Sequence, residues 1–352
     1  MDPEELNDSK MAPKATFFPT YGFRAGSNWE IPIRAWVHSN HGFVERFLAG
    51  VVADFHKLTD EERHNFEDRM ADLVSDDIKS KQVSIVFDRD PEKHRFAILD
   101  ETRGPAQTDL NGAIDGTILI PTAFGDQLLA PSINGWLTFH TEQDPPGSGS
   151  VQLLEPTGES VISDIDDTIK VTGIPAGVEV VVRNTFFRNF GAVAGMAQRY
   201  HELPAQSFHY VSGAPWPLYR TEAAFLLGSA GFPPGSFHLK PLDRNILSRA
   251  TWESLEELAK DRFDTKLATF KHKVLQITRL LTNFPGRKFT LFGDSGEKDP
   301  EVYQLMRSEF PQSIAAIYIR DVKNDEVNHP DRLARMKIIQ APAILPGVDL
   351  VP

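Results

Sequence analysis

The chain contains no cysteine among its 352 residues. This absence excludes disulfide bonds, thiolate metal sites and cysteine nucleophiles, and it is consistent with a reducing compartment. Long apolar runs are absent too, since no stretch approaches the ~20 apolar residues that a membrane-spanning helix requires. The first ten residues, MDPEELNDSK, are too polar for a signal peptide, so we expect a cytoplasmic protein.

Positive charge is also scarce. Lysine and arginine number 37 against 49 aspartate and glutamate residues, which gives a formal net charge of −12 at pH 7. Such a chain is not a general nucleic-acid binder, and any anionic partner requires a local basic patch. The apolar content of 41% is ordinary for a soluble protein and allows a sizeable core.

The pattern of the chain changes near Pro156-Thr157-Gly158. Before this point apolar residues mostly alternate with period two, which predicts a β-rich amino-terminal domain over residues 15–156. Residues 43–73 have helical spacing instead, with Thr59 capping a second helix. We expect residues 1–14 to be a disordered tail and residues 341–352 to be a further tail. The predicted strands are residues 29–38, 83–87, 135–140 and 151–154, the last after a hairpin turn at 144–149.

Strands and helices alternate after the boundary, over residues 157–340. This alternation predicts an α/β domain with a doubly wound parallel sheet. The expected strands are residues 159–163, 208–212, 237–239, 288–292 and 314–319, and the expected helices are residues 192–203, 217–227, 252–259, a long helix around 270–284, and 300–310.

The sequence Val161-Ile162-Ser163-Asp164-Ile165-Asp166-Asp167-Thr168 is the most informative stretch. Its apolar start predicts a buried strand with acids at its carboxyl end, where open α/β sheets bind ligands. Asp164 and Asp166 repel each other there unless a cation or a shared proton offsets the repulsion. Mg²⁺ is a suitable cation, because it takes one or two carboxylates and leaves sites for phosphate oxygens.

Two later strands also end in polar residues. Ser212 closes the strand HYVS and is followed by Gly213. The sequence GDSGEKD, residues 293–299, follows a strand and precedes a helix. Asp299 stands directly before Pro300, which predicts a helix N-cap followed by proline at the first helical position. Direct metal coordination by Asp299 stays open beside that interpretation.

SDIDDTIKVTG fits the D-x-D-x-T signature of the haloacid dehalogenase phosphatases. With HYVSGAPWPLY, FPPGSFHLK and KFTLFGDSGEKDPEVY, it resembles the actin-patch phosphatidate phosphatase family of fungi and its bacterial relatives. The resemblance covers residues 160–320. It implies a Rossmann-like, haloacid dehalogenase-like catalytic domain and a Mg²⁺-dependent phosphatase that converts phosphatidate to diacylglycerol and phosphate. It also implies peripheral attachment to phosphatidate-containing membranes and contacts with actin-patch or endocytic proteins.

The resemblance assigns Asp164 as the nucleophile that forms an aspartyl-phosphate, and Asp166 as the general acid and base. Thr168 would fix the loop, while Ser212 and backbone N–H groups near Gly213 would hold the phosphoryl group. For Asp167 we expect exposure to solvent. The implied metal ligands are Asp164, Asp166 through its backbone carbonyl, Asp294 and Asp299.

A cation must also neutralise the phosphoryl charge. Lys273 is favoured, because His272-Lys273 near the start of the long helix matches the family pattern. Lys240 competes for this role and would otherwise bind substrate.

Basic and aromatic residues interleave in RNTFFRNF, residues 183–190. Arg183 could bind the lipid phosphate while Phe186 and Phe187 enter the membrane interface, or the stretch is an ordinary partly buried helix.

Two other functions stay open. One is hydrolysis of a soluble phosphomonoester, and the other is phosphatidate binding without turnover, although the three acids Asp164, Asp166 and Asp294 favour turnover.

Overall fold

The computed structural model describes residues 12–39, 58–73, 75–142, 145–241 and 266–340. The chain forms two compact units, of which the first holds residues 1–157, 215–219 and 235–258. The second holds residues 158–214, 220–234 and 259–352. Among the described residues, no helix is both long and apolar enough to cross a bilayer.

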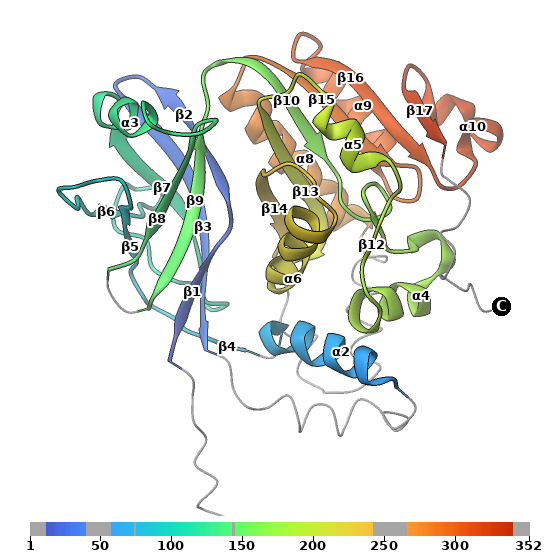
Figure 1. Ribbon diagram of the computed structural model, residues 1–352. Helices are drawn as coiled ribbons and strands as arrows, with labels where there is room; N and C mark the ends of the chain where they lie inside the picture. Colours follow the sequence, from blue (N-terminus) through green and yellow to red (C-terminus); the bar gives the residue numbers. More distant parts are fainter. Residues whose placement is uncertain (1–11, 40–57, 74, 143–144, 242–265, 341–352) are drawn as a thin grey trace, which may run out of the picture. The chain divides into compact units, whose positions relative to one another are not determined.

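The first unit is built on a mostly antiparallel sheet with the order β1-β3-β2-β9-β8-β5-β6 (Figure 1), in which β4 and β7 pair with β3. The period-two pattern predicts it correctly: Trp29, Ile31 and Ile33 alternate with more exposed neighbours and enter the core. Its strands are β1 (Lys14–Phe17), β2 (Thr20–Ala25), β3 (Asn28–Ser39), β4 (Asp76–Asp77), β5 (Ser84–Phe87), β6 (Phe96–Ala97), β7 (Ala113–Pro121), β8 (Trp136–His140) and β9 (Gly147–Leu153). This unit also contains α2 (Asp60–Leu73), α3 (Thr122–Leu129), η4 (Trp216–Leu218) and β14 (Ser236–Lys240).

Two local predictions in this unit are confirmed. The N–H of Glu62 donates to Thr59 Oγ1 at 3.2 Å and the N–H of Thr59 donates to Glu62 Oε2 at 2.9 Å, so the two residues form a capping box before α2. β8 and β9 pair antiparallel, with His140 opposite Ser148, as a hairpin requires.

The predicted disordered tail, residues 1–14, is too long, because β1 begins at Lys14, which pairs with His38. Residues 1–11 of that tail, residues 43–57 of the predicted helical stretch and residues 341–352 lie outside the described residues.

The second unit contains a parallel sheet in which the strands follow the order β13-β10-β15-β16-β17 (Figure 1). The predicted α/β class with a parallel sheet is therefore confirmed. Residues of β10, β13 and β15 are mostly buried, as expected for strands covered on both faces. The strands are β10 (Thr157–Ser163), β13 (Ser207–Pro215), β15 (Gly286–Asp294), β16 (Ile314–Asp321) and β17 (Lys337–Gln340), with β11 (Lys170–Val171) and β12 (Gly191–Ala192) forming a separate pair.

The helices of this unit depart from the predictions at glycine and at irregular turns. The helix expected over 192–203 begins only at Met196, because Gly195 before it has a φ of 76°. The helix expected over 217–227 is divided into η4, α6 and the π-helical turn η5. The one expected at 252–259 lies outside the described residues. The helices and helical turns are η2 (Ile174–Ala176), α4 (Val178–Val182), η3 (Arg183–Phe187), α5 (Met196–His201), α6 (Tyr219–Ala223), η5 (Ala224–Ser229), α8 (Lys266–Asn283), α9 (Asp299–Glu309), α10 (Asp325–Asn328) and η7 (Pro330–Leu333).

The long helix α8 ends before Pro285-Gly286, as predicted. Its buried face includes Ile277, Leu280 and Leu281, at helical spacing, and the buried Phe284 directly follows the helix. Lys273 lies on the same face, one turn before Ile277, and its side chain is only 1% exposed. The buried apolar face of α8 therefore includes one positively charged side chain, that of Lys273.

Candidate active site

Asp164 directly follows β10 and is completely enclosed. Its N–H donates to the carbonyl of Phe292 in β15 at 2.9 Å, which ties the loop to the neighbouring strand. Thr168 Oγ1 donates to Asp164 Oδ2 at 3.1 Å, and Lys273 Nζ lies 2.8 Å from Oδ1. Both carboxylate oxygens are therefore fixed in direction, as a nucleophile requires. The structure thus brings Asp164, Thr168 and Lys273 together.

A group of three buried carboxylates forms around this position. Asp164, Asp294 and Asp299 each offer an oxygen, and the three oxygens lie within 4.8 Å of one another. Burial, followed by repulsion from the neighbouring carboxylates, raises the pKa of Asp294. Burial also raises the pKa of Asp164 and Asp299, with Lys273 opposing the shift in both. Because the negative charges repel one another, such a group is stabilised when it binds either protons or a cation.

Asp299 does not act as the predicted helix cap. The N-cap of α9 is Lys298, and no side chain caps the helix. The Asp299 carboxylate instead accepts a hydrogen bond from the N–H of Asp294 at 3.2 Å and forms an ion pair with Lys273. Gly293 permits this approach, because a Cβ there would lie 2.6 Å from the Cβ of Asp299. The Asp299 carboxylate therefore lies beside Asp294 and Lys273.

Lys273 is the cation of this group. Its Nζ contacts Asp164, Glu297 at 3.0 Å and Asp299. Burial lowers the pKa of Lys273, but attraction to the three carboxylates outweighs burial and raises the pKa above its ordinary value. Lys273 therefore stays charged at neutral pH. Lys240, its predicted competitor, lies on β14 in the first unit.

The residues fit a divalent cation. Asp294 Oδ1 accepts a hydrogen bond from the N–H of Gly296, whereas Oδ2 is buried and has no hydrogen-bond partner. Lys273 contacts three carboxylates, and that of Asp294 lies beside two of them, so the group has an excess of negative charge. Carboxylate oxygens are the ligands that Mg²⁺ prefers. Asp294 Oδ2, a buried oxygen without a hydrogen-bond partner in this acidic group, is therefore suited to bind such an ion.

Asp166 has different partners. Its Oδ1 accepts a hydrogen bond from Thr172 Oγ1 at 2.6 Å and lies 3.0 Å from Lys170 Nζ. Its Oδ2 accepts a hydrogen bond from Ser212 Oγ at 3.0 Å. Ser212 Oγ in turn accepts the N–H of Ala214 at 2.9 Å. Within the described ranges, the grouped metal-ligand oxygens do not include those of the Asp166 carboxylate.

Gly213 follows Ser212 within β13, which continues to Pro215 instead of ending at Ser212 as predicted. A Cβ there would lie 2.8 Å from Thr269 Cγ2, so the close approach of α8 requires glycine. The structure therefore places Ser212 and Gly213 near Asp166, although they are distant in sequence.

The prediction that Asp167 faces solvent is wrong. The residue is only 3% exposed and has a φ of 54°, a conformation that aspartate tolerates better than most residues. Its carboxylate accepts hydrogen bonds from the N–H groups of Thr172, Gly173 and Ile174. Asp167 thus holds together the loop that carries the two catalytic candidates.

The stretch 183–190 does not present its aromatic residues for membrane contact as suggested. Phe186 and Phe187 are 2% and 3% exposed, because the π-helical turn η3 directs them into the second unit. Phe190 packs on Phe225, with ring centroids 5.4 Å apart. Arg183 remains exposed, and its Nη2 lies 3.3 Å from Glu179 Oε1. The alternative of a partly buried helical segment describes this stretch better.

Comparison with known proteins agrees with this geometry. The family model described as the phosphatidate phosphatase APP1 catalytic domain matches residues 159–321. The phosphatidate phosphatase APP1 of Saccharomyces cerevisiae is 33% identical over 182 residues, which cover 50% of this chain and 28% of that protein. An uncharacterized protein of Schizosaccharomyces pombe is 29% identical over 179 residues, which cover 50% of this chain and 27% of the relative. The match thus spans little more than a quarter of the length of these relatives. Over residues 159–321, which include all the acids of the site, the chain is similar to the APP1 catalytic domain.

Proposed function

We propose that this chain is a Mg²⁺-dependent phosphatidate phosphatase that releases diacylglycerol and phosphate. The observation that carries the proposal is the fixed carboxylate of Asp164 beside the unpaired oxygen of Asp294 and the ammonium of Lys273. A nucleophile, an acidic metal site and a charge-neutralising lysine are the parts that phosphoryl transfer requires. The haloacid dehalogenase-like assignment of the fold belongs to the same proposal, supported by the position of Asp164 and Asp294 at the ends of β10 and β15.

In the first step, an oxygen of Asp164 attacks the phosphorus and the bond from phosphorus to the glycerol oxygen breaks. Asp166, in its protonated form, gives its proton to the departing alkoxide, so that neutral diacylglycerol leaves. Ser212 releases its hydrogen bond to Asp166 and donates to a phosphoryl oxygen instead. The product of this step is an aspartyl-phosphate on Asp164.

In the second step, a water molecule attacks the aspartyl-phosphate. Asp166, now ionised, takes a proton from this water, and the bond between phosphorus and the Asp164 oxygen breaks. Phosphate leaves, Asp164 is restored as a carboxylate and Asp166 is protonated again. Lys273 stays in place through both steps and offsets the negative charge of the equatorial oxygens.

Asp164, Asp294 and Asp299 would hold the Mg²⁺ ion, together with the backbone carbonyl of Asp166. When bound, the ion supplies further neutralisation of phosphoryl charge. Lys273 contacts Asp164 and Asp299, so it also balances part of the ligand charge.

The lipid substrate is inferred from the yeast relative, which is named as a phosphatidate phosphatase. Action on phosphatidate implies contact with a membrane surface, and we propose peripheral attachment of a cytoplasmic protein. Arg183 is an exposed cation that can contribute to this contact. Contacts with actin-patch proteins remain a prediction from the family.

Phosphate release from vesicles of phosphatidylcholine and phosphatidate tests this function. We expect release that depends on Mg²⁺, that is stopped by a chelator and that is lost in Asp164→Asn. Glycerol 3-phosphate and p-nitrophenyl phosphate serve as soluble comparisons. Turnover of the soluble esters alone would support a phosphomonoesterase instead. Vesicle binding without release from any ester would indicate a lipid-binding module.

A further inference from the structure

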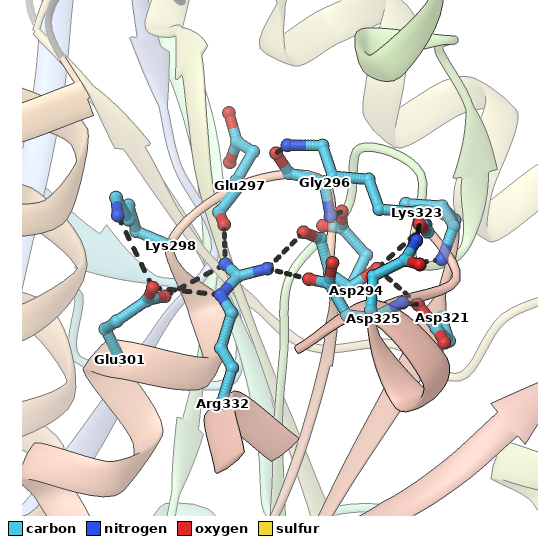
Figure 2. A network of polar contacts seen from close by, with 12 residues as sticks. Asp294, Gly296, Glu297, Lys298, Glu301, Asp321, Lys323, Asp325 and Arg332 are labelled. Atoms are coloured by element: carbon cyan, nitrogen blue, oxygen red, sulfur yellow. Dashed lines mark hydrogen bonds and ion pairs between the residues drawn. The ribbon is translucent and has the colours of Figure 1, made fainter. Parts of the chain in front are cut away.

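The acidic loop of residues 294–298 accepts hydrogen bonds from a residue that lies outside residues 159–321, the segment matched by the family model. Arg332, at the end of the chain segment that follows β16, directs its guanidinium at this loop (Figure 2). Nη1 donates to the carbonyl of Ser295 at 2.6 Å, and Nη2 donates to the carbonyl of Glu297. Since the family match ends at residue 321, similarity gave no indication of this contact.

The guanidinium is itself firmly held. Nε and Nη2 donate to the two oxygens of Glu301 in α9, at 2.9 and 3.0 Å, and Nη1 forms an ion pair with Asp325. Each N–H of the fork therefore has an acceptor, which makes the arginine a rigid link rather than a flexible surface charge. Lysine could not make this set of bonds, because its ammonium is not a planar fork.

A third carbonyl of the loop is held from the same segment. Lys323 Nζ donates to the carbonyl of Gly296 at 2.7 Å (Figure 2). Three consecutive carbonyls, those of residues 295, 296 and 297, thus face donors that follow β16.

The direction of these carbonyls determines the direction of the N–H groups. In a trans peptide unit the carbonyl of one residue and the N–H of the next point in opposite directions. When Arg332 holds the carbonyl of Ser295, the N–H of Gly296 is turned the other way, and it donates to Asp294 Oδ1. This bond occupies one oxygen of Asp294 and leaves Oδ2 without a partner.

We propose that Arg332 is a positioning residue for the metal-binding loop: by fixing the Ser295 and Glu297 carbonyls, it orients Asp294 so that Oδ2 is presented to the ion. The inference deepens the proposed function and rests on it for the identity of the ion. Its structural part, the restraint of the loop, can be measured without any substrate.

The test compares Arg332→Met and Arg332→Lys with Arg307→Met as a matched control. Arg307, on α9, also donates to two backbone carbonyls, at 2.7 Å to Arg335 and 3.1 Å to Ala334, but neither belongs to the acidic loop. Amide hydrogen exchange of peptides covering residues 294–298 is measured without added metal. The Mg²⁺ concentration for half-maximal hydrolysis of p-nitrophenyl phosphate and the Mg²⁺-induced rise in Tm are then measured for each protein.

In Arg332→Met we expect faster exchange in the loop, a smaller rise in Tm and a Mg²⁺ requirement roughly 10–100-fold higher, as is typical when a partner of a metal ligand is lost. KM at saturating Mg²⁺ should change much less. Arg332→Lys should recover little of the loss, and Arg307→Met should match the wild type in all three measurements. If Arg332→Met does not fold, the comparison rests on Arg332→Lys.

Wild-type exchange and a wild-type Mg²⁺ requirement in a folded Arg332 variant would overturn the inference, as would equal effects in Arg307→Met. A wild-type protein that hydrolyses no ester would refute the proposed function instead. In that case the exchange and Tm comparisons alone would decide the role of Arg332.

Discussion

Lys170 and Glu222 form a buried ion pair in which Nζ lies 2.6 Å from Oε1, although the residues are 52 positions apart. The side chains are 1% and 0% exposed. The same ammonium lies 3.0 Å from Asp166 Oδ1 and 4.8 Å from the centroid of the Phe190 ring. One cation therefore links α6 to the proposed general acid.

Loss of this cation should destabilise the protein strongly. Lys170→Met leaves two buried carboxylates without their shared partner, so we expect the free energy of unfolding to fall by about 3–5 kcal/mol. In the double variant Lys170→Met/Glu222→Gln one of these charges is gone, and part of the loss should be recovered. Urea unfolding of the wild type, both single variants and the double variant measures this coupling. Strictly additive losses would contradict the shared-cation account.

The two catalytic aspartates should differ in their dependence on the leaving group. Asp164→Asn should lower kcat by more than about 10⁴-fold with every ester, because an amide cannot form the acyl phosphate. Asp166→Asn should slow an alkyl phosphate by roughly 10²–10⁴-fold but affect p-nitrophenyl phosphate less, since nitrophenolate leaves without a proton. Steady-state kinetics on both esters measures the difference. Substantial turnover by a folded Asp164→Asn would exclude it as the nucleophile.

Activity should depend on Mg²⁺ through Asp294. A chelator should abolish hydrolysis and Mg²⁺ should restore it, whereas Ca²⁺ should substitute poorly because it accepts looser geometry. Asp294→Ala should raise the Mg²⁺ requirement by at least about tenfold, since it removes the unpaired oxygen. Titrations of activity with metal provide the measurement. Full activity in excess chelator would rule out this site.

Asp321 should make stability depend on pH in the acid range. Its carboxylate accepts hydrogen bonds from the N–H groups of Asp325 and Glu326 and from Ser295 Oγ, at 2.8, 2.9 and 2.8 Å. Burial raises the pKa of Asp321, but these hydrogen bonds together outweigh burial and hold the pKa below its ordinary value. The stabilisation is therefore complete at a pH above the unfolded value of about 3.9, and it is lost as the pH falls through the folded value.

The variant Asp321→Asn should consequently lose about 1–2 kcal/mol of stability at neutral pH and show a flatter decline between about pH 5 and 2. Tm measured across this range, with Asp331→Asn at an exposed position as the control, tests the expectation. Parallel pH profiles of Asp321→Asn and wild type would assign the acid sensitivity to other groups.

Much of the site could be predicted because its residues follow apolar strands. Asp164 directly follows β10 and Asp294 ends β15, and the ends of neighbouring strands in one sheet lie close together. The strand expected to end at Ser212 continues to Pro215. Lys273 was favoured because His272-Lys273 matches the family pattern. Local pattern and the known behaviour of parallel sheets indicated where the acids gather, whereas the roles of Asp164 and Lys273 came from the resemblance.

The remaining contacts depend on partners that are distant in sequence. Nothing near Lys170 identifies Glu222, and nothing in the loop 294–298 identifies Arg332. Asp167 was misassigned because an acid in a polar loop ordinarily faces water, whereas here the backbone turns inward around it. For Phe186 and Phe187 the sequence left membrane contact and a partly buried helix both open, and their burial favours the second.

The hydrogen bond from Arg332 to Ser295 affects the order in which the site can form during synthesis. Synthesis proceeds from the amino terminus, so the acids at 164, 294 and 299 leave the ribosome before the arginine that fixes their loop. Until residue 332 has emerged, the carbonyls of Ser295 and Glu297 lack their donor. The acidic loop can therefore be fully restrained only once residue 332 has been synthesised, shortly before the residues of β17.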